Sequence, residues 1–249
     1  MKTSVEVIIH PVCLRFSYHN NEIVYMFASN PEQQLDEMEK LMGVETDQGP
    51  IFDSNVGFLP VASTILIRGE KNILVDPGNH HIGFYSMLKR ALNSKNLTYE
   101  DIDIIVTTHT HADHAAAIVH FRDKPWVIGE GEFKDFEAIE GKEIVEAKKK
   151  MMGDITEIRG DGETEIMKDV IALKTPGHTS GHISLIVNSE NKKVLIAGDQ
   201  TMTRSEYINR TFSRWYPKQN LLDLNKSLDK VQKYKPDLVI PGHDRPFCP

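Results

Sequence analysis

The sequence contains only two cysteines, Cys13 and Cys248, which lie near opposite ends of its 249 residues. Their number and spacing exclude a disulfide framework and a cysteine-rich metal site. A chain of this length buries enough of its surface to fold without covalent cross-links. We therefore expect a protein of a reducing compartment, and the predicted localisation is cytoplasmic.

Positive charge is also scarce. Lysine and arginine together number 29 against 36 acidic residues, which gives a formal net charge of −7. Binding to nucleic acid depends largely on basic side chains that neutralise phosphates, so this balance offers no electrostatic reason to expect such a partner. A local basic patch remains compatible with the composition.

Long apolar runs are absent as well. No window approaches the roughly 18 uninterrupted apolar residues of a membrane-spanning helix. Glu6 stands where a signal peptide requires an apolar segment, so we expect no membrane partner. A hydrophobic fraction of 40% with 26% charged residues is that of an ordinary globular protein.

One pattern occurs twice along the chain. Residues 64–76 and 184–199 each read as a strand, a polar turn and a buried strand that ends on an aspartate. No linker rich in proline, glycine or serine separates the two halves, so we predict one domain over 1–249, with a helical insertion around 30–60. The remaining predicted strands are 4–9, 23–28, 102–107, 126–128 and 237–240, and the predicted helices are 84–93, 132–150 and 221–233. Between the insertion's helix and Phe58 we expect a loop.

Seven side chains with metal-binding chemistry share one feature, because each follows an apolar stretch that we predict to be a strand. They are His109, His111, Asp113, His114, His178, Asp199 and His243. Loops at the ends of strands meet at one edge of an α/β fold, which brings together residues that are distant in sequence. The sequence therefore predicts a single cluster of these residues.

Imidazole nitrogens and carboxylate oxygens are the donors that zinc binds. The pair His109 and His111 spans a tight turn and can face one ion, whereas Asp113 and His114 would face a neighbouring position. Seven donors crowd one ion, but they leave room for water and substrate around two ions ~3.5–4 Å apart. We predict two divalent metal ions, most readily zinc, and the same donor types also suit iron or manganese.

The segment 109–114, His-Thr-His-Ala-Asp-His, resembles the HxHxDH signature of the metallo-β-lactamase superfamily of hydrolases, and the resemblance extends from about Val61 to His243. It implies an α/β fold of the αββα four-layer sandwich type, with the metals at one edge. The resemblance also implies two sets of ligands with one shared residue: His109, His111 and His178 for one metal, Asp113, His114 and His243 for the other, and Asp199 bridging both. Asp113 is in addition the predicted catalytic residue, which would orient the attacking water and transfer its proton.

Further residues are expected to support this site. Asp76 resembles the family's acidic residue at the end of the first-half strand, which orients the ligand loop through hydrogen bonds. His182 is expected to be a packed or hydrogen-bonded histidine beside the site. The loop 200–220 is rich in aromatic residues and arginine and lies where the family places substrate-facing elements. From it we predict Tyr207, Arg210 and Trp215 as substrate contacts.

The predicted function is metal-dependent hydrolysis of a small ester, lactone or thioester, because many compact members of the superfamily act on these bonds. The acyl-homoserine lactonases carry a catalytic tyrosine three residues after the bridging aspartate, where this chain has Met202. One alternative is a phosphodiesterase or nuclease of the same superfamily, since two ions can stabilise both oxygens of an in-line displacement. A further alternative is a persulfide dioxygenase with a single iron on the same positions. The expected partner is a small-molecule substrate, and a homo-oligomer is compatible with the sequence.

Overall fold

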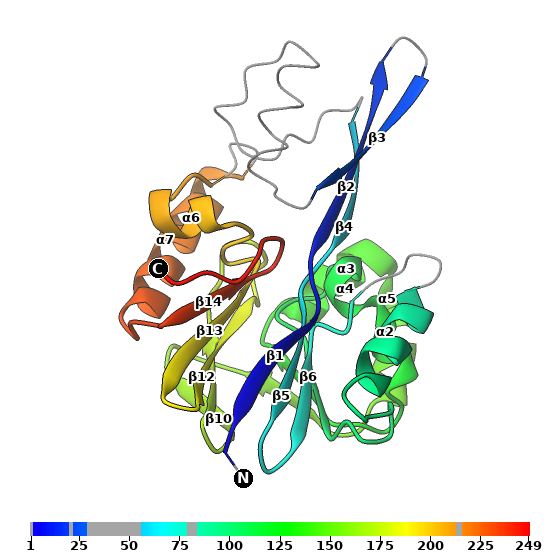
Figure 1. Ribbon diagram of the computed structural model, residues 1–249, viewed down its shortest axis with the longest axis vertical. Helices are drawn as coiled ribbons and strands as arrows, with labels where there is room; N and C mark the ends of the chain where they lie inside the picture. The colour runs from blue at the N-terminus through cyan, green and yellow to red at the C-terminus, as the bar shows by residue number, and fades with distance from the viewer. Residues whose placement is uncertain (1, 20–21, 29–55, 79–83, 213–215) are drawn as a thin grey trace.

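Two β-sheets lie face to face in the computed structural model, and helices cover their outer faces (Figure 1). The structure describes residues 2–19, 22–28, 56–78, 84–212 and 216–249. The helix expected in the 30–60 insertion and the predicted substrate residue Trp215 lie outside these ranges.

The first sheet has six strands in the order β1-β5-β6-β7-β8-β9. Their bounds are β1 (Ser4–Ile9), β5 (Thr64–Arg68), β6 (Asn72–Val75), β7 (Ile104–Val106), β8 (Trp126–Gly129) and β9 (Ile155–Ile158). β1, β5 and β6 are antiparallel neighbours, whereas β6 to β9 run parallel to one another. The wholly apolar β7 lies between two parallel neighbours and is buried throughout, as expected for a strand covered on both faces.

The second sheet has five strands, β10 (Glu163–Met167), β11 (Val170–Lys174), β12 (Ile183–Ser189), β13 (Lys192–Gly198) and β14 (Leu238–Pro241). They are antiparallel except for the last pair, β13 and β14, which run parallel. The repeated pattern of the sequence forms the hairpins β5–β6 and β12–β13, one in each sheet. Each half therefore delivers a strand that ends on an aspartate.

A third, three-stranded sheet in the order β3-β2-β4 projects from the sandwich (Figure 1). It consists of β2 (Val12–His19), β3 (Glu22–Ala28) and β4 (Val56–Val61). The prediction of a loop through Phe58 was wrong for residues 56–58, because they belong to β4, which pairs with β2, Val12 lying opposite Val61; the rest of the predicted loop lies outside the described residues. Such pairing joins residues far apart in the chain, so the local pattern of 43–58 contains no sign of it.

The helices are α2 (Phe84–Asn93), α3 (Ala112–Ala115), the 3₁₀ helix η1 (Ala116–His120), α4 (Glu132–Glu140), α5 (Lys142–Met151), α6 (Arg204–Asn209) and α7 (Lys218–Gln232). The single helix predicted over 132–150 is two helices, because Gly141 between them has a φ of 90°, which a right-handed helix cannot accommodate. None of the helices in the described part of the chain combines the length and the apolarity that crossing a bilayer requires.

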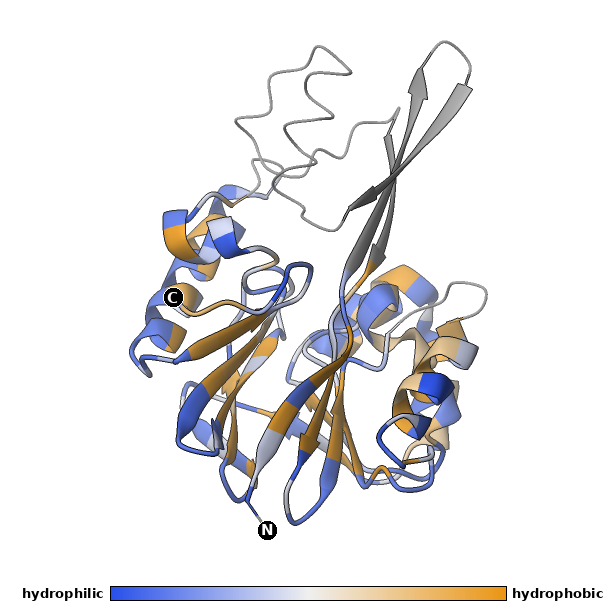
Figure 2. Ribbon diagram, viewed as in Figure 1, coloured by the Kyte–Doolittle hydropathy of each residue, from blue (hydrophilic) through white to orange (hydrophobic). Residues whose placement is uncertain are grey.

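Three apolar layers hold the sandwich together. The middle layer lies between the two sheets and includes Ile67 and Leu185. One outer layer joins the first sheet to α2, α4 and α5, and the other joins the second sheet to α7 through residues such as Leu228. Apolar residues follow the strands of both sheets, and polar residues gather at their loops (Figure 2). The αββα four-layer architecture is therefore confirmed.

Candidate metal centre

Two pairs of parallel strands end at the same edge of the sandwich, and the candidate ligands follow them. In the first sheet, the backbone N–H of Asp76, after β6, donates to the carbonyl of Val106 in β7 at 2.9 Å. In the second sheet, the N–H of Gly242, after β14, donates to the carbonyl of Gly198 at the end of β13 at 2.9 Å. These bonds align the ends of neighbouring strands. The side chains that follow them therefore start from adjacent positions.

The seven candidate ligands meet at this edge. Nδ1 of His111 lies 3.0 Å from Nε2 of His178. Nε2 of His243 lies 3.3 Å from Oδ2 of Asp113 and 3.4 Å from Nε2 of His114. The structure thus brings together side chains from the segments that follow β7, β13 and β14 and from the turn between β11 and β12.

Asp199 lies in the middle of the cluster. Its Oδ2 is 3.3 Å from Nε2 of His178 and 3.3 Å from Nε2 of His243, and its Oδ1 is 3.3 Å from Nε2 of His114. The backbone of Gly242 makes this position possible, because a Cβ there would lie 2.0 Å from Oδ1 of Asp199. Only glycine at 242 lets the two strand ends approach this closely.

Three overlapping sets of side chains can hold a metal ion, and the ligand atoms within each set all lie within 4.8 Å of one another. The sets are His109, His111 and His178; His109, His114 and Asp199; and Asp113, His114 and His243. The first and third have no member in common, and the second contains residues of both together with Asp199. The two outer sets are therefore candidate ligand sets, and the set with Asp199 overlaps both.

Asp76 holds the ligand loop by three hydrogen bonds. Its carboxylate accepts from the backbone N–H of Thr108 at 2.7 Å, from the hydroxyl of Thr108 at 2.8 Å and from Nδ1 of His114 at 2.8 Å. When a metal ion displaces the second ring proton of His114, the proton that Asp76 holds on Nδ1 would leave the lone pair of Nε2 for the ion. Asp76 therefore lies where the sequence predicted a residue that orients the ligands.

His182 is fully buried behind Asp199 and contacts it through the backbone. Its Nε2 accepts the N–H of Asp199 at 3.1 Å, and its Nδ1 lies 2.9 Å from the hydroxyl of Thr175. Both ring nitrogens are thus engaged by protein groups. His182 is a hydrogen-bonded histidine that fixes the backbone of Asp199, and neither of its ring nitrogens is left to bind an ion.

Burial keeps several histidines of the cluster neutral. It lowers the pKa of His178 to about 3, although the nearby charge of Asp199 acts in the opposite direction. Burial likewise lowers the pKa of His109 well below its usual range. Neutral imidazole is the form that binds a metal. These two side chains are ready to act as ligands near neutral pH.

Buried carboxylates create a strong demand for positive charge in the other half of the cluster. Burial alone would lower the pKa of His114, but Asp199, Asp113 and Asp76 outweigh it and raise that pKa to about 10. Burial is outweighed in the same way at His243, whose pKa lies well above its usual range, chiefly because of Asp199. In the metal-free chain protons on these two histidines meet part of this demand. Divalent cations would supply more positive charge to the same carboxylates.

The spacing of the donors fits metal coordination. Zinc binds nitrogen and oxygen at about 2.0–2.2 Å, so two tetrahedral ligands of one ion lie roughly 3.3–3.6 Å apart. Two of the separations are 3.0 Å, between Nδ1 of His111 and Nε2 of His178, and 3.9 Å, between Nε2 of His109 and Oδ2 of Asp199. Nε2 of His109 is buried and has no hydrogen-bond partner among the described residues. A metal ion would give this nitrogen a partner.

The predicted substrate residues in the loop after Asp199 are engaged elsewhere. Tyr207 is 4% exposed and packs edge-on against Phe247 within the outer core layer of the second sheet. Arg210 donates to Oδ1 of Asp229 at 2.6 Å and to Asn225 at 3.1 Å, which ties it to α7. The structure therefore brings neither side chain into the cluster of candidate ligands, because Tyr207 packs in the core and Arg210 hydrogen-bonds to α7.

Sequence reasoning missed Glu132, the first residue of α4. Its side chain is fully buried, and burial raises its pKa to about 6 against the opposing effect of hydrogen bonds from Thr179 and Thr110. These two threonines adjoin the candidate ligands His178 and His109. A glutamate in the first turn of a helix is so common that the sequence gave no reason to single it out.

Glu206 and Tyr216 were also missed. Glu206 is buried, which raises its pKa to about 8, and its Oε2 accepts the backbone N–H of Met202 at 2.5 Å. It thereby shapes the loop that follows Asp199. The hydroxyl of Tyr216 lies 2.5 Å from Nδ1 of His178. Tyr216 is 5% exposed and thus forms part of the buried support of the cluster.

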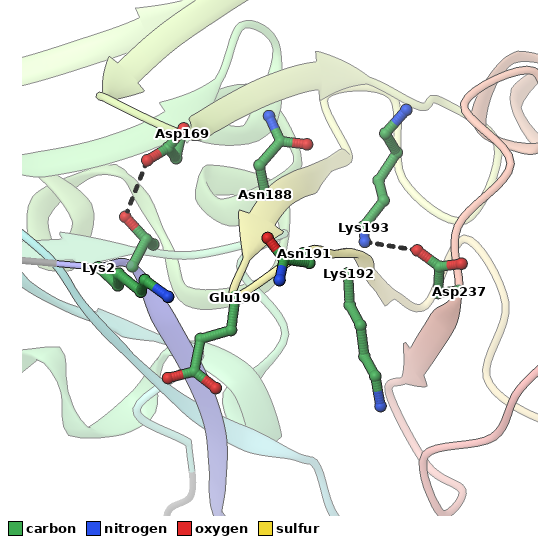
Figure 3. Close-up of a pocket in the computed structure, with 9 residues that line it drawn as sticks. Lys2, Asp169, Asn188, Glu190, Asn191, Lys192, Lys193 and Asp237 are labelled. Carbon is green, nitrogen blue, oxygen red and sulfur yellow. Dashed lines mark hydrogen bonds between the residues drawn. The ribbon is translucent and has the colours of Figure 1, made fainter.

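A separate polar cavity of about 490 Å³ opens at the far end of the strands (Figure 3). Lys192 and Lys193, which line it, begin β13, whereas Asp199 follows the end of that strand. Seven strand residues span roughly 20 Å. Two of its carboxylates are already paired, Asp169 with the hydroxyl of Thr3 and Asp237 with the backbone N–H of Lys193. The cavity is therefore separate from the cluster of candidate metal ligands.

Comparison with known proteins agrees with this geometry. The sequence model of the Metallo-beta-lactamase superfamily matches residues 56–243. The chain belongs to the metallo-beta-lactamase superfamily. The match includes all seven candidate ligands and most of both sheets, and the family resemblance of the sequence is confirmed.

Individual relatives in the superfamily point the same way. An N-acyl homoserine lactonase of a Bacillus species is 30% identical over 206 residues, which cover 81% of this chain and 79% of the lactonase. A protein of Methanocaldococcus jannaschii described as a probable metallo-hydrolase is 28% identical over 193 residues, which cover 73% of this chain and 87% of that protein. The chain is thus a metallo-hydrolase of the superfamily.

A solved structure shares the fold of this chain. It is that of an N-acyl homoserine lactone hydrolase with a product bound at its catalytic metal centre. Its TM-score to this chain is 0.66 at 21% identity, over 98% of this chain and 93% of that one. At this identity the likeness concerns the fold.

Proposed function

We propose that this chain hydrolyses a carboxylic ester, lactone or thioester of a small molecule at a centre of two divalent metal ions, preferably zinc. The observation that carries the proposal is the set of three overlapping His/Asp groups, with Asp199 between the two outer groups. His109, His111 and His178 would hold one ion, and Asp113, His114 and His243 the other. Asp199 would contact both.

The protein contributes position and charge to this reaction. When bound, the ions would lower the pKa of water towards ~7 and polarise the carbonyl oxygen of the substrate. Asp113 has the more exposed carboxylate of the two proposed ligands, with 11% of its side chain accessible against 4% for Asp199. Asp113 would accept a hydrogen bond from the attacking water and carry its proton to the leaving group. Asp76 and His182 hold the surrounding backbone and ring in place.

Two findings support an acyl substrate over the alternatives. Two relatives named N-acyl homoserine lactonase align over 81% of this chain. The chain also has a net charge of −7, which disfavours a polyanionic substrate such as nucleic acid.

Met202, at the position of the lactonases' tyrosine, is buried, and its N–H donates to Glu206. Residues other than the one at position 202 would therefore orient the substrate in this chain.

A substrate panel tests the proposal directly. Zinc-loaded protein would be assayed with N-acyl homoserine lactones of several chain lengths, an aryl ester, a thioester and bis(p-nitrophenyl) phosphate, beside elemental analysis. We expect two zinc ions per chain and kcat/KM at least about 100-fold higher for the best acyl substrate than for the phosphodiester. A preference for the phosphodiester, or one iron per chain with uptake of oxygen, would overturn the assignment.

Replacing Tyr216 with phenylalanine tests the support of His178. Since Nε2 of His178 faces the cluster, its Nδ1 donates to the hydroxyl of Tyr216, and the variant removes that acceptor. We expect a loss of roughly 10-fold in kcat/KM at limiting metal, as is usual for partners of metal-bound histidines. Tyr234→Phe is the matched control, because that hydroxyl donates to Glu163 at the exposed surface. Equal activity of both variants across metal concentrations would argue against this role of Tyr216.

A further inference from the structure

One buried carboxylate joins the two loops that carry the first histidine set. Oε2 of Glu132 accepts from the backbone N–H and from the hydroxyl of Thr110, both at 3.0 Å. Its Oε1 accepts from the N–H of Gly181 at 3.2 Å and from the hydroxyl of Thr179. All four partners are donors, and each oxygen of the carboxylate serves a different loop.

These donors lie directly beside metal-binding candidates. Thr110 stands between His109 and His111, and Thr179 follows His178 in the chain. These three histidines are the complete first set, whose nitrogens lie within 4.8 Å of one another. Glu132 thus contacts the neighbours of every member of that set. His114 belongs to another set. Among the described residues outside the cluster, the carboxylate that hydrogen-bonds to His114 is that of Asp76.

The packing around Glu132 leaves it little freedom. A Cβ on Gly181 would lie 2.5 Å from the backbone nitrogen of Glu132, so the start of α4 rests against the loop that follows His178. Asp135, in the same turn of α4, accepts from the N–H and hydroxyl of Ser180 at 3.0 and 2.8 Å. The loop of His178 is therefore attached to α4 at two points. Among the described residues of α4, Glu132 is the one whose side chain also hydrogen-bonds to the loop of His109.

We propose that Glu132 is a positioning residue that sets the separation of the His109–His111 pair from His178 and thereby the affinity of one metal position. This inference rests on the metal assignment of the proposed function. The second position, formed by Asp113, His114 and His243, receives no hydrogen bond from Glu132 among the described residues. The effect of Glu132 should accordingly be confined to one of the two ions.

Glu132→Gln isolates this role because it keeps the shape of the side chain. Each carboxylate oxygen faces a backbone N–H, of Thr110 on one side and of Gly181 on the other, and neither can reverse its direction. An amide has a single oxygen, so one of these buried N–H groups would face an NH₂ group. One of the two loops would then shift. The distance between the ligands it carries and the others would change with it.

The experiment is a titration of metal-free protein with Co²⁺, followed by visible absorption and by competition with a chromophoric chelator. For Glu132→Gln we expect one of the two affinities to fall by roughly 10- to 100-fold, as for other residues behind metal ligands. The other affinity should change by less than about 3-fold. Glu130→Gln, an exposed glutamate two residues away, is the matched control and should bind both ions like the wild type.

Thr179→Val provides a second, milder variant, because it removes one hydroxyl that donates to Glu132 and leaves the backbone intact. It should weaken the same ion, and the loss in the double variant should be smaller than the sum of the single losses. If Glu132→Gln does not fold, this variant carries the test. Wild-type affinity for both ions in the variants that fold, or equal weakening of both ions, would overturn the proposal. A wild type that binds one ion would refute the dinuclear proposal, and the ratio of variant to wild type would still decide the role of Glu132.

Discussion

Asp199→Asn should reduce kcat/KM for the best acyl substrate by roughly 10³-fold, the largest effect that we expect of a single substitution. Oδ2 of Asp199 lies 3.3 Å from Nε2 of both His178 and His243, so the side chain contacts both ligand sets. Asparagine has no negative charge to balance two cations and only one oxygen to share. Kinetics together with metal content per chain would measure the loss.

Asp161→Asn is a suitable control for this variant. Asp161 is exposed in the turn between β9 and β10, so the same chemical change should leave kinetics and metal content as in the wild type. We expect Asp199→Asn to retain the fold by circular dichroism and to lose at least one of the two ions. If it kept both ions and full activity, the bridging role of Asp199 would be refuted.

Removal of the metals should abolish activity and lower the melting temperature by roughly 10 °C. A ligand at 1,000 times its Kd stabilises the folded state by ~4.1 kcal/mol. In a domain of 150–250 residues, 1 kcal/mol shifts the melting temperature by about 2–4 °C. The physical reason is the pair of buried carboxylates proposed as ligands, Asp113 and Asp199, which would lose their cations. Protons on His114 and His243 replace only part of that charge.

The measurement compares dialysis against a chelator with dialysis against buffer, followed by thermal unfolding and assay. Addition of Zn²⁺ to the chelated protein should restore both the melting temperature and the activity, which shows that the loss is reversible. Full activity in protein that elemental analysis finds free of metal would contradict metal-dependent hydrolysis.

The sequence predicted which residues gather, because their position after strands is a local feature. His109 to His114 follow β7, Asp199 follows β13 and His243 follows β14. The order of strands in a sheet then brings these ends to one edge. Their function as ligands stays a prediction, although their spacing fits it. Tyr207 and Arg210 were chosen from the composition of their loop and from its place in the family resemblance, and the structure engages both in contacts with the core or with α7.

The residues that hold the ligands in place could not be read in the same way. Glu132 starts an ordinary amphipathic helix, and Tyr216 is one aromatic residue among several in its segment. Their importance comes from partners 22 to 49 positions away, such as Thr110 and Gly181 for Glu132. A hydrogen bond across that separation leaves no periodic signal in the sequence. It becomes apparent in the folded structure.

By itself, the sequence determined the superfamily and the seven side chains with metal-binding chemistry, since a compact motif is a property of a short segment, and the resemblance to the superfamily implied the four-layer fold. Tertiary structure decided the pairing of β4 with β2 and the close approach of Gly242 to Asp199. It also decided that a buried glutamate links two ligand loops. These features depend on how distant segments pack, and each local sequence is compatible with many such packings until the whole chain has folded.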